Sequence, residues 1–480
     1  MKNFKKSVAL VAALILTAST LAACDTAEKE DGTTAATEPG ATPTTAAPTG
    51  EALTVEQGKV LNIYVWNDEV EQRLEQFYLT DGEAPVVDGV AKKDDITINF
   101  LKTPNEGLAY QDKLDQVLPG NADKAADERA DMFAFEADYA LKYVNTDFTM
   151  DIGSLGLTDA DFAGQYKYTQ QIATDDNGLI KAVSWQANPC GLIYRRSIAT
   201  DVLGSDDLDT VQAAVADWTK YAETAAKMGE KGYAMESAYG SSFRQFSNNA
   251  QKAIVVDGVI SVPDEWKQWA EQTKTFADNG WNLKSDGMWS GASTAGYKKD
   301  GKVFCYAGPA WLFNFTMLPN AMDDPDAGAV AGNGSVGDWG IVAGPAPSYW
   351  GGTWLAAATG TDNGEIIKDI MLKLCADKEV AKKLATTNGV EDYANNIAGM
   401  QEVAASDFQS VFFGGQNQFQ ILAPLAEKID VSKTLSPYGQ LAETFQNTML
   451  GYFEGTVSYD EALNNFYSEA LTRYPELTQG

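Results

Sequence analysis

The sequence predicts an α/β fold that is built on a parallel sheet and ends in a helix-rich C-terminal part. Three apolar runs, each typical of a buried strand, alternate with helical patterns near the start of the folded chain. From Gly364 to the end the periodicity is helical, and strand signals almost disappear. A chain of 480 residues has room for about two to four domains.

The strands of the parallel sheet can be placed in order. Val60–Trp66 opens the folded part, and a helical pattern then runs to about Tyr78. Ile96–Leu101 is the second strand, and a helix near Tyr110–Val117 separates it from the third strand, Asp131–Phe135. Ligands of such sheets bind beyond the carboxyl ends of the strands. The side chains expected at two of these ends are Trp66, Asn67, Asp68, Glu69, Glu136 and Asp138.

Shorter strands are expected in the middle of the chain. The Asp-Asn-Gly sequence at 176–178 is a hairpin-type turn. A Pro-Cys-Gly break at 189–191 separates two strand-like runs, and the chain could enter a second lobe there. Residues 209–280 look mostly helical, interrupted by an Asp-Gly turn at 257–258. Further strands are expected at 303–307, 339–342 and 353–358.

Residues 1–24 have the parts of a secretory signal peptide. Lysines at positions 2, 5 and 6 precede a short apolar stretch, and Leu21-Ala22-Ala23-Cys24 stands at the cleavage position. This stretch resembles the bacterial lipobox, so we expect Cys24 to be lipid-modified and to anchor the protein. The alternative is an ordinary signal with a chance cysteine. Residues 25–58 are acidic, rich in Thr, Ala and Pro, and lack aromatic residues, which predicts a disordered tether.

Composition excludes several function classes. The chain has no histidine, so Ser-His-Asp and Cys-His catalysis and His-ligated metal sites are impossible. Its formal charge of -31 repels phosphate backbones, which argues against nucleic-acid binding. Cys190, Cys305 and Cys375 are an odd number in the folded part and give no complete disulfide framework.

Two motifs suggest a cofactor or a metal ion, but each has a plainer interpretation. Residues 332–337 match GxGxxG, yet a strand follows them instead of a helix, which predicts a surface loop. The acidic cluster Asp323–Asp326 could hold a calcium ion, although a solvated turn fits it better. We therefore expect no cofactor and no metal site.

The 11 tryptophans are more informative, because several stand beside amide, carboxylate or hydroxyl groups. Aromatic faces stack on the flat C–H faces of a pyranose, and planar amides or carboxylates bind its hydroxyl rim. Trp218, Trp266 and Trp269 lie in amphipathic helical patterns and are expected in the core. The remaining candidates for ligand binding are Trp185, Gln186, Trp289, Trp311, Trp354, Gln416 and Asn417.

Two other functions stay open at this point. A pair of carboxylates flanking a glycosidic bond would make a glycoside hydrolase, and 67 acids always offer some pair. Acids and aromatics together could also form a box for a cationic polyamine. The strand-poor C-terminal third argues against the (β/α)8 barrel that such a hydrolase would need.

Several stretches of the folded part, taken in their order along the chain, resemble the carbohydrate-specific solute-binding lipoproteins of bacterial ABC importers. This group includes maltodextrin-binding protein. The resemblance runs from about Leu61 to Tyr474. Cys190 departs from it, since many relatives have glycine there. The stretches that carry the resemblance are 66–69, 184–189 with 194–196, 337–339, 351–354, 414–417 and 455–463.

The resemblance implies a two-lobed periplasmic-binding-protein-like fold with three inter-lobe crossings and a ligand cleft. It places lobe one at about 59–184 plus 350–395, and lobe two at about 186–347 plus 396–480. The cleft would collect the candidate residues named above, while Tyr194, Arg195 and Arg196 would be structural, near the hinge. It further implies a monomer that binds an oligosaccharide, breaks no bond, and passes the sugar to permease subunits at the outer face of the cytoplasmic membrane.

Overall fold

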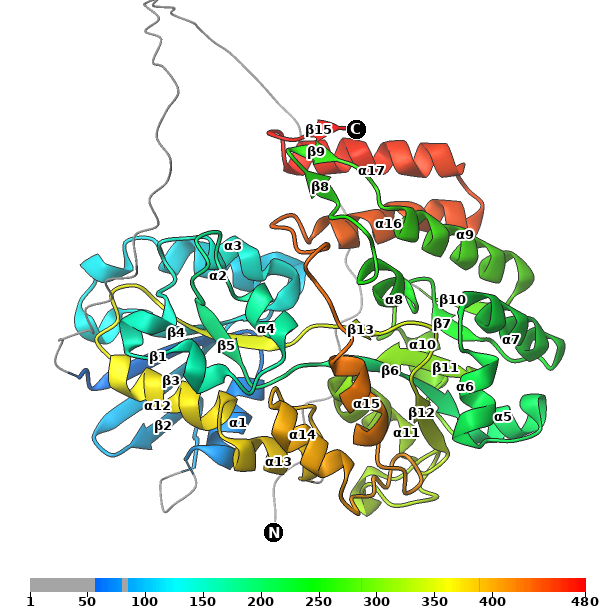
Figure 1. Cartoon of the computed structure of the whole chain (residues 1–480), viewed down its shortest axis with the longest axis horizontal. Coiled ribbons are helices and arrows are strands. Elements are labelled where there is room, and N and C mark those ends of the chain that lie inside the picture. Colours follow the sequence, from blue (N-terminus) through cyan, green and yellow to red (C-terminus); the bar gives the residue numbers. More distant parts are fainter. Residues whose placement is uncertain (1–56, 80–84, 286, 388) are drawn as a thin grey trace, which may run out of the picture. The chain divides into compact units, whose positions relative to one another are not determined.

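The computed structural model describes residues 57–79, 85–285, 287–387 and 389–480. The signal peptide, Cys24 and almost all of the tether lie outside the described residues, so these expectations stay predictions. The described part holds two larger sheets with helices packed around them, and each sheet with its helices forms one lobe (Figure 1). No helix within these ranges is long and apolar enough to cross a membrane.

The first sheet contains the three predicted parallel strands. β1 (Val60–Val65) lies between β3 (Ile96–Lys102) and β4 (Met132–Glu136) and is parallel to both. α1 (Glu69–Phe77) and α2 (Ala109–Val117) follow β1 and β3, as the periodicity predicted. The full strand order is β2-β3-β1-β4-β14-β5. Of these, β2 (Val90–Lys93), β14 (Thr353–Ala357) and β5 (Ala182–Ser184) pair antiparallel with their neighbours.

The second sheet is antiparallel and is centred on β6 (Pro189–Arg195). The prediction of a break at Pro-Cys-Gly was wrong, because these residues begin β6. Proline is tolerated as the first residue of a strand, and Gly191 lets Ile341 pack closely, since a Cβ there would lie 2.5 Å from its Cδ1. The break falls at residues 185–188, where Asn188 has a φ of 53°. The partners of β6 are β11 (Cys305–Gly308), β12 (Trp339–Val342) and β13 (Ser348–Tyr349).

The region 209–280 is mostly helical, as predicted, but it also supplies short strands. β7 (Glu236–Ala238) pairs with β10 (Asn282–Ser285), and three residues are too few to show a period in the sequence. The turn at 257–258 joins β8 (Val255–Val256) to β9 (Val259–Ile260). The helices of this lobe are α5 (Arg196–Leu203), α6 (Leu208–Ala214), α7 (Trp218–Glu230), α8 (Phe243–Ser247), α9 (Asp264–Asn279), α10 (Gly291–Ala295) and α11 (Leu318–Ala321).

The C-terminal part is helical, as predicted, apart from the two-residue β15 (Thr478–Gln479). α16 packs on α9 and α17, where Trp266 and Trp269 lie in an apolar core (Figure 1). The helices are α12 (Gly364–Cys375), α13 (Lys378–Thr386), α14 (Ile397–Ala404), α15 (Phe419–Ala426), α16 (Leu441–Glu454) and α17 (Tyr459–Arg473). The first lobe adds α3 (Ala140–Val144) and α4 (Lys167–Ile172).

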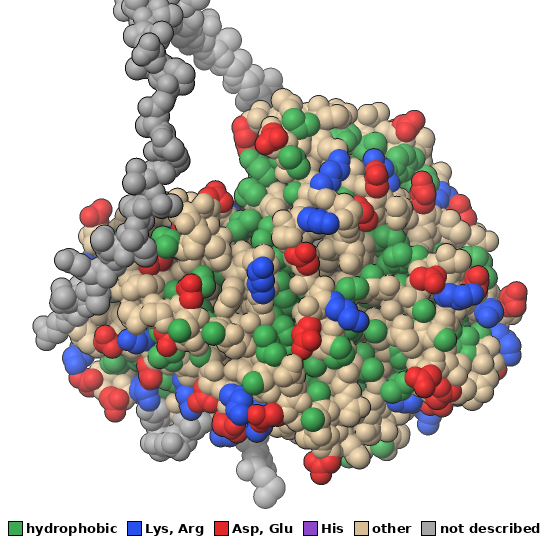
Figure 2. Space-filling model, viewed as in Figure 1, with side chains coloured by type: hydrophobic (Ala, Val, Ile, Leu, Met, Phe, Trp, Pro, Cys, Tyr) green, Lys and Arg blue, Asp and Glu red, His purple; other side chains and the backbone are tan. Residues whose placement is uncertain are grey.

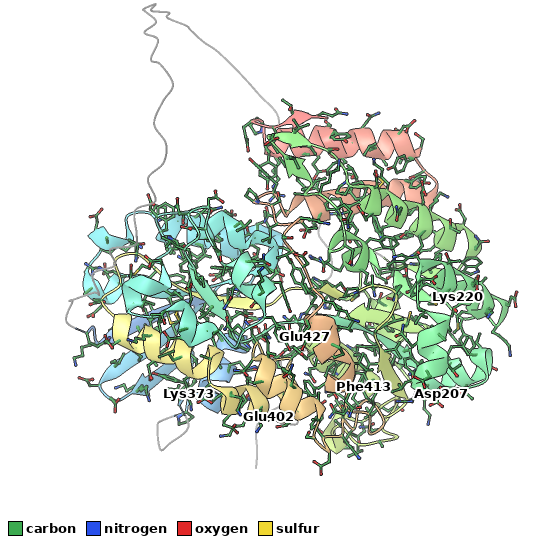
Figure 3. All side chains as sticks on the ribbon, viewed as in Figure 1. Asp207, Lys220, Lys373, Glu402, Phe413 and Glu427 are labelled. Carbon is green, nitrogen blue, oxygen red and sulfur yellow. The ribbon has the colours of Figure 1, made fainter. Side chains whose placement is uncertain are left out.

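The exposed side chains carry both signs of charge, which are interspersed over the face drawn in Figure 2. Many form short surface ion pairs. Lys378 and Lys382 both contact Glu402, at 2.6 and 2.9 Å, and Lys373 lies 2.8 Å from Asp377 (Figure 3 labels Lys373 and Glu402). Exposed pairs of this kind contribute about 0–1 kcal/mol each.

A carboxyl group is buried in the second lobe. Glu236 is 1% exposed, and its Oε1 accepts a 2.9 Å hydrogen bond from the Tyr221 hydroxyl. The same hydroxyl lies 3.4 Å from the Cys305 thiol, and the Asn282 amide nitrogen lies 3.5 Å from Oε2. Burial raises the pKa of Glu236 from 4.5 to about 7.

This carboxyl should make stability depend on pH. Because its pKa in the folded state exceeds the unfolded value, it stabilises the fold fully below about pH 4.5 and loses that contribution as the pH rises through 7. The loss between about pH 5 and pH 8 should be roughly 2–3 kcal/mol. Urea unfolding across this range should therefore show a flatter profile for Glu236→Gln than for the wild type. Parallel profiles would mean that Glu236 titrates normally.

Candidate functional site

A cavity of about 690 Å³ lies beyond the carboxyl ends of β1 and β4. Trp66 follows β1, and Glu136 ends β4, so the sheet topology places both at the cavity wall. Residues 238–244 and 287–289 of the second lobe form another wall, and residues 439–450, at the start of α16 and along it, form a third. Four of the sequence-predicted residues line this cavity: Trp66, Glu136, Asp138 and Trp289.

Aromatic rings dominate one side of the cavity. Trp289 is 62% exposed, which is unusual for so large an apolar side chain and is typical of a binding surface. Its ring is nearly parallel to that of Trp311, with centroids 6.3 Å apart, and lies 5.8 Å from Trp350. The Trp311 indole nitrogen donates a 3.1 Å hydrogen bond to the Trp350 carbonyl, which holds two of the three rings in place.

Charged groups lie beside these rings. The Arg244 guanidinium forms a bidentate ion pair with Asp138. Nη1 lies 2.6 Å from Oδ1, and Nη2 donates to Oδ2. This guanidinium also lies 5.4 Å from the centre of the Trp350 ring. Glu136 accepts a 2.9 Å hydrogen bond from the Asp138 backbone nitrogen. Burial and the Asp138 carboxylate raise the pKa of Glu136 to about 8, although Arg244 opposes them, so Glu136 can donate a hydrogen bond at neutral pH.

Several lining residues had no signal in the sequence. Gln440 donates from Nε2 to Oε1 of Gln111 across 2.9 Å, which joins the segment before α16 to α2. Gln111 lies in α2 and Arg244 in α8, and neither they nor Trp350 are among the residues that the sequence predicts for the site. The other polar lining residues include Asn105, Ser241, Glu443, Gln446 and Asn447.

Glu69 and Gln186, expected in the cleft, meet instead in a buried cluster where the chain passes between the sheets. Gln186 donates from Nε2 to Glu69 at 2.7 Å and to Asp392 at 2.8 Å. Thr353 donates its hydroxyl to Glu69 at 3.1 Å. Arg73 is 2% exposed, with Nη2 3.9 Å from Glu69 and 3.8 Å from Asp392. Burial and Asp392 raise the pKa of Glu69 to about 7, opposed by Arg73.

Five other candidates also lie outside the cavity lining, among them Trp311, which packs against Trp289 and Trp350. Asn67 accepts a 3.0 Å hydrogen bond from the Glu69 backbone at the start of α1, and Asp68 forms an exposed ion pair with Lys102. Trp185 and Trp354 are each 1% exposed. The Trp354 indole donates a 3.1 Å hydrogen bond to the Thr169 carbonyl, so its polar group is satisfied within the core.

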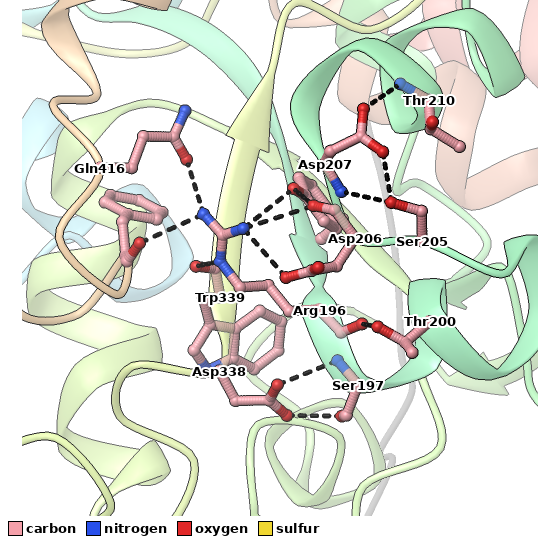
Figure 4. Close-up of polar contacts among 12 residues, drawn as sticks. Arg196, Ser197, Thr200, Ser205, Asp206, Asp207, Thr210, Asp338, Trp339 and Gln416 are labelled. Carbon is pink, nitrogen blue, oxygen red and sulfur yellow. Dashed lines mark hydrogen bonds and ion pairs between the residues drawn. The ribbon is translucent and has the colours of Figure 1, made fainter.

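Gln416 and Asn417 bind backbone groups of the second lobe and the C-terminal part. Gln416 accepts a hydrogen bond from the Ile341 backbone nitrogen at 3.0 Å. It also accepts one from Arg196 Nη2 at 3.3 Å, which Figure 4 shows. Asn417 accepts from the Phe419 nitrogen at 3.0 Å, at the start of α15. The expected placement of these two amides in the cleft is therefore corrected, because each is used to fix a loop to its neighbours.

Tyr194, Arg195 and Arg196 make contacts within the second lobe, but they lie at the end of β6 away from the crossing at 185–188 and so not near the hinge as expected. Arg195 is 1% exposed and lies 4.5 Å above the Trp339 ring. Arg196 donates from Nε to the Trp339 carbonyl at 2.8 Å and pairs with Asp206 (Figure 4). The Tyr194 hydroxyl donates to the Asp206 carbonyl at 2.7 Å.

The motifs set aside in the sequence also have structural explanations. Residues 332–337 form turns before β12, and Gly334 packs against the Ala321 carbonyl. Asp323 and Asp324 are exposed, and their backbone nitrogens donate to the Asn333 side chain. Within the described ranges no group of three or more Asp, Glu or Cys side chains could hold a metal ion, and the three cysteines are buried and unpaired.

Comparison with known proteins agrees with this architecture. The family model for bacterial extracellular solute-binding proteins matches residues 85–408. A solved extracellular solute-binding protein of family 1 has 19% identity and a TM-score of 0.68, over 86% of this chain and 99% of that chain. A search of curated protein sequences found no significant match.

Two further solved structures were determined with sugars. An ABC transporter associated binding protein from B. animalis subsp. lactis, in complex with beta-1,6-galactobiose, has 17% identity and a TM-score of 0.62, over 88% of this chain and 99% of that chain. An ABC substrate-binding protein from Listeria monocytogenes, in complex with cycloalternan, has 13% identity and a TM-score of 0.59 over the same shares. These likenesses show the two-lobed fold. Because the family model spans more than half of the chain, the protein belongs to the bacterial extracellular solute-binding proteins, which are binding proteins and not enzymes.

Proposed function

We propose that this protein binds an oligosaccharide in the 690 Å³ cavity and delivers it to an ABC sugar importer. The observation that carries the proposal is the exposed Trp289 ring, which faces the cavity beside Trp311 and Trp350, with carboxylates and amides around the rest of the lining. This arrangement matches the apolar faces and hydroxyl rim of a sugar ring. Two structural relatives, solved with beta-1,6-galactobiose and cycloalternan, support the same ligand class.

The roles proposed for the lining residues follow from their chemistry. Trp66, Trp289 and Trp350 would stack on sugar faces, with Trp311 behind them. Glu136, Asp138 and Arg244 would bind hydroxyl groups, and the protonated Glu136 would donate where the other carboxylate accepts. Because Arg244 is paired with Asp138 and the lining also carries Glu443 and Glu469, a cationic polyamine is the alternative that the screen below tests.

Anchoring and domain motion complete the proposal. Cys24 would carry the lipid, and residues 25–58 would tether a monomeric receptor at the outer face of the cytoplasmic membrane. The changes of sheet between β5 and β6 and between β13 and β14 support lobes near 59–184 plus 350–395 and 186–347 plus 396–480. A ligand that contacts both lobes would favour the closed state, which permease subunits would recognise.

A thermal-shift screen tests the proposal. The protein from near Glu51 to the C-terminus would be heated with α- and β-linked oligosaccharides and, separately, with spermidine. Ligand at about 100 times its dissociation constant adds about 2.7 kcal/mol, so one sugar series should raise the midpoint and be recovered intact. A shift with spermidine alone, or shortened sugar products, would overturn the proposal.

Trp289→Ala should weaken sugar binding about tenfold, because it removes one exposed stacking surface. Its 62% exposure means that the free energy of unfolding should change little. Isothermal titration calorimetry with the sugar found in the screen measures the effect. Phe148→Ala is the matched control, since Phe148 is also exposed (37%) but lies outside the cavity lining. Equal affinities of the two variants would remove Trp289 from the site.

A further inference from the structure

A second cavity of about 440 Å³ adjoins the first. Five residues line both cavities: Leu108, Gln111, Tyr139, Gln440 and Arg473. We propose that the binding site continues into this second cavity, so that the protein takes a neutral oligosaccharide longer than the first cavity holds. This inference rests on the proposed function and adds a ligand length to it.

The boundary between the cavities is polar and joins the two sides of the cleft. Gln111 belongs to α2, and Gln440 precedes α16. Both residues line both cavities, and a 2.9 Å hydrogen bond joins their side chains. Arg473 of α17 donates to Gln440 Oε1. The two amides and the guanidinium offer both donors and acceptors. A sugar hydroxyl at this boundary can therefore replace one partner in the existing hydrogen bonds.

Tyr139 adds an aromatic surface at the same boundary. It is 7% exposed, and it lines both cavities. The position of Tyr139 therefore favours a ligand that extends through both cavities.

The lining of the second cavity is suited to a terminal sugar unit. Tyr474, partly buried, gives it an aromatic side, with its ring centre 5.0 Å from that of Tyr438. Asp112, Lys142 and Asn145 are exposed and give it a polar rim. The Lys142 ammonium lies 2.7 Å from the Asp115 carboxylate, which neutralises its charge. This part of the rim therefore does not favour an anionic ligand. An aromatic side with a mixed polar rim again matches a neutral sugar.

Isothermal titration calorimetry on the full folded part tests the inference. The ligands are two series of increasing length, malto-oligosaccharides and β-1,6-linked galacto-oligosaccharides, each starting at the disaccharide. Affinity should rise by about tenfold or more beyond the disaccharide. Asn145→Trp, which fills the second cavity from an exposed position, should abolish that rise and leave disaccharide affinity within about twofold. Tyr474→Ala should also reduce the rise. Asn279→Trp, at an exposed end of α9 away from both cavities, is the control.

The outcomes separate the two proposals. An affinity that does not change with length, or a rise that survives both Asn145→Trp and Tyr474→Ala, overturns the second cavity and leaves the sugar receptor intact. Failure of both series to bind overturns the sugar receptor itself, and the length proposal with it.

Discussion

Arg73→Ala should lower the free energy of unfolding by about 3–5 kcal/mol. Arg73 and Asp392 are each 2% exposed, and Arg73 Nη2 lies within 4 Å of both Asp392 and Glu69. Its removal leaves two carboxyl groups buried without a cation, at the place where the chain passes between the lobes. Urea unfolding at pH 7.5 and at pH 5.5 measures the loss, which should shrink at the lower pH as Glu69, with a pKa of about 7, takes up a proton.

Lys373→Ala is the control for this result. Lys373 also pairs with a carboxylate, Asp377 at 2.8 Å, but 45% of its side chain is exposed. Its loss should cost about 0–1 kcal/mol. Arg73→Met combined with Asp392→Asn should recover part of the stability, because the buried charges disappear together. If Arg73→Ala behaves like Lys373→Ala, then the buried cluster is not held by charge.

Trp354→Ala should destabilise the protein by about 3–5 kcal/mol through the cavity it leaves in the first sheet. The sequence placed Trp354 in the ligand cleft, where its loss would weaken binding without unfolding. The structure places it 1% exposed on β14, between β4 and β5, with its indole bonded to Thr169. Thermal unfolding of the variant, with and without ligand, measures the effect.

Trp354→Phe separates the two interpretations. It keeps most of the buried ring and loses the hydrogen bond to Thr169, so its destabilisation should be smaller. In this variant sugar affinity should equal that of the wild type. A tenfold weaker affinity with unchanged stability would return Trp354 to the site.

The parts of the fold that local patterns determine could be predicted from the sequence. The runs that form β1, β4 and β12 are mostly apolar, and the run that forms β3 alternates apolar with polar residues, so both patterns predicted strands. Because β1 and β4 are parallel neighbours, their carboxyl ends meet at one edge, and the cavity lined by Trp66, Glu136 and Asp138 lies there. Arg244 and Gln440 could not be found, since they reach the cavity from helical segments far along the chain.

The same local pattern misplaced other candidates for a physical reason. A tryptophan or glutamine beside small and polar residues can bind a ligand, or it can form hydrogen bonds within the fold. The sequence alone does not distinguish these two roles. Gln416 bonds the edge of β12, and Gln186 bonds Glu69 and Asp392. Trp289 differs because no fold contact buries it, and that difference is visible only in three dimensions.

The place of β14 in the first sheet also constrains how the chain is made. Thr353–Ala357 lies between β4 and β5 and pairs with both, although it follows the whole second sheet in the sequence. A chain emerging from the ribosome therefore carries β4 and β5 long before the strand that joins them exists. The first lobe can close only after most of the protein has been synthesised, through contacts of high sequence separation that form slowly. Such a topology leaves the first sheet incomplete until nearly all of the chain is available.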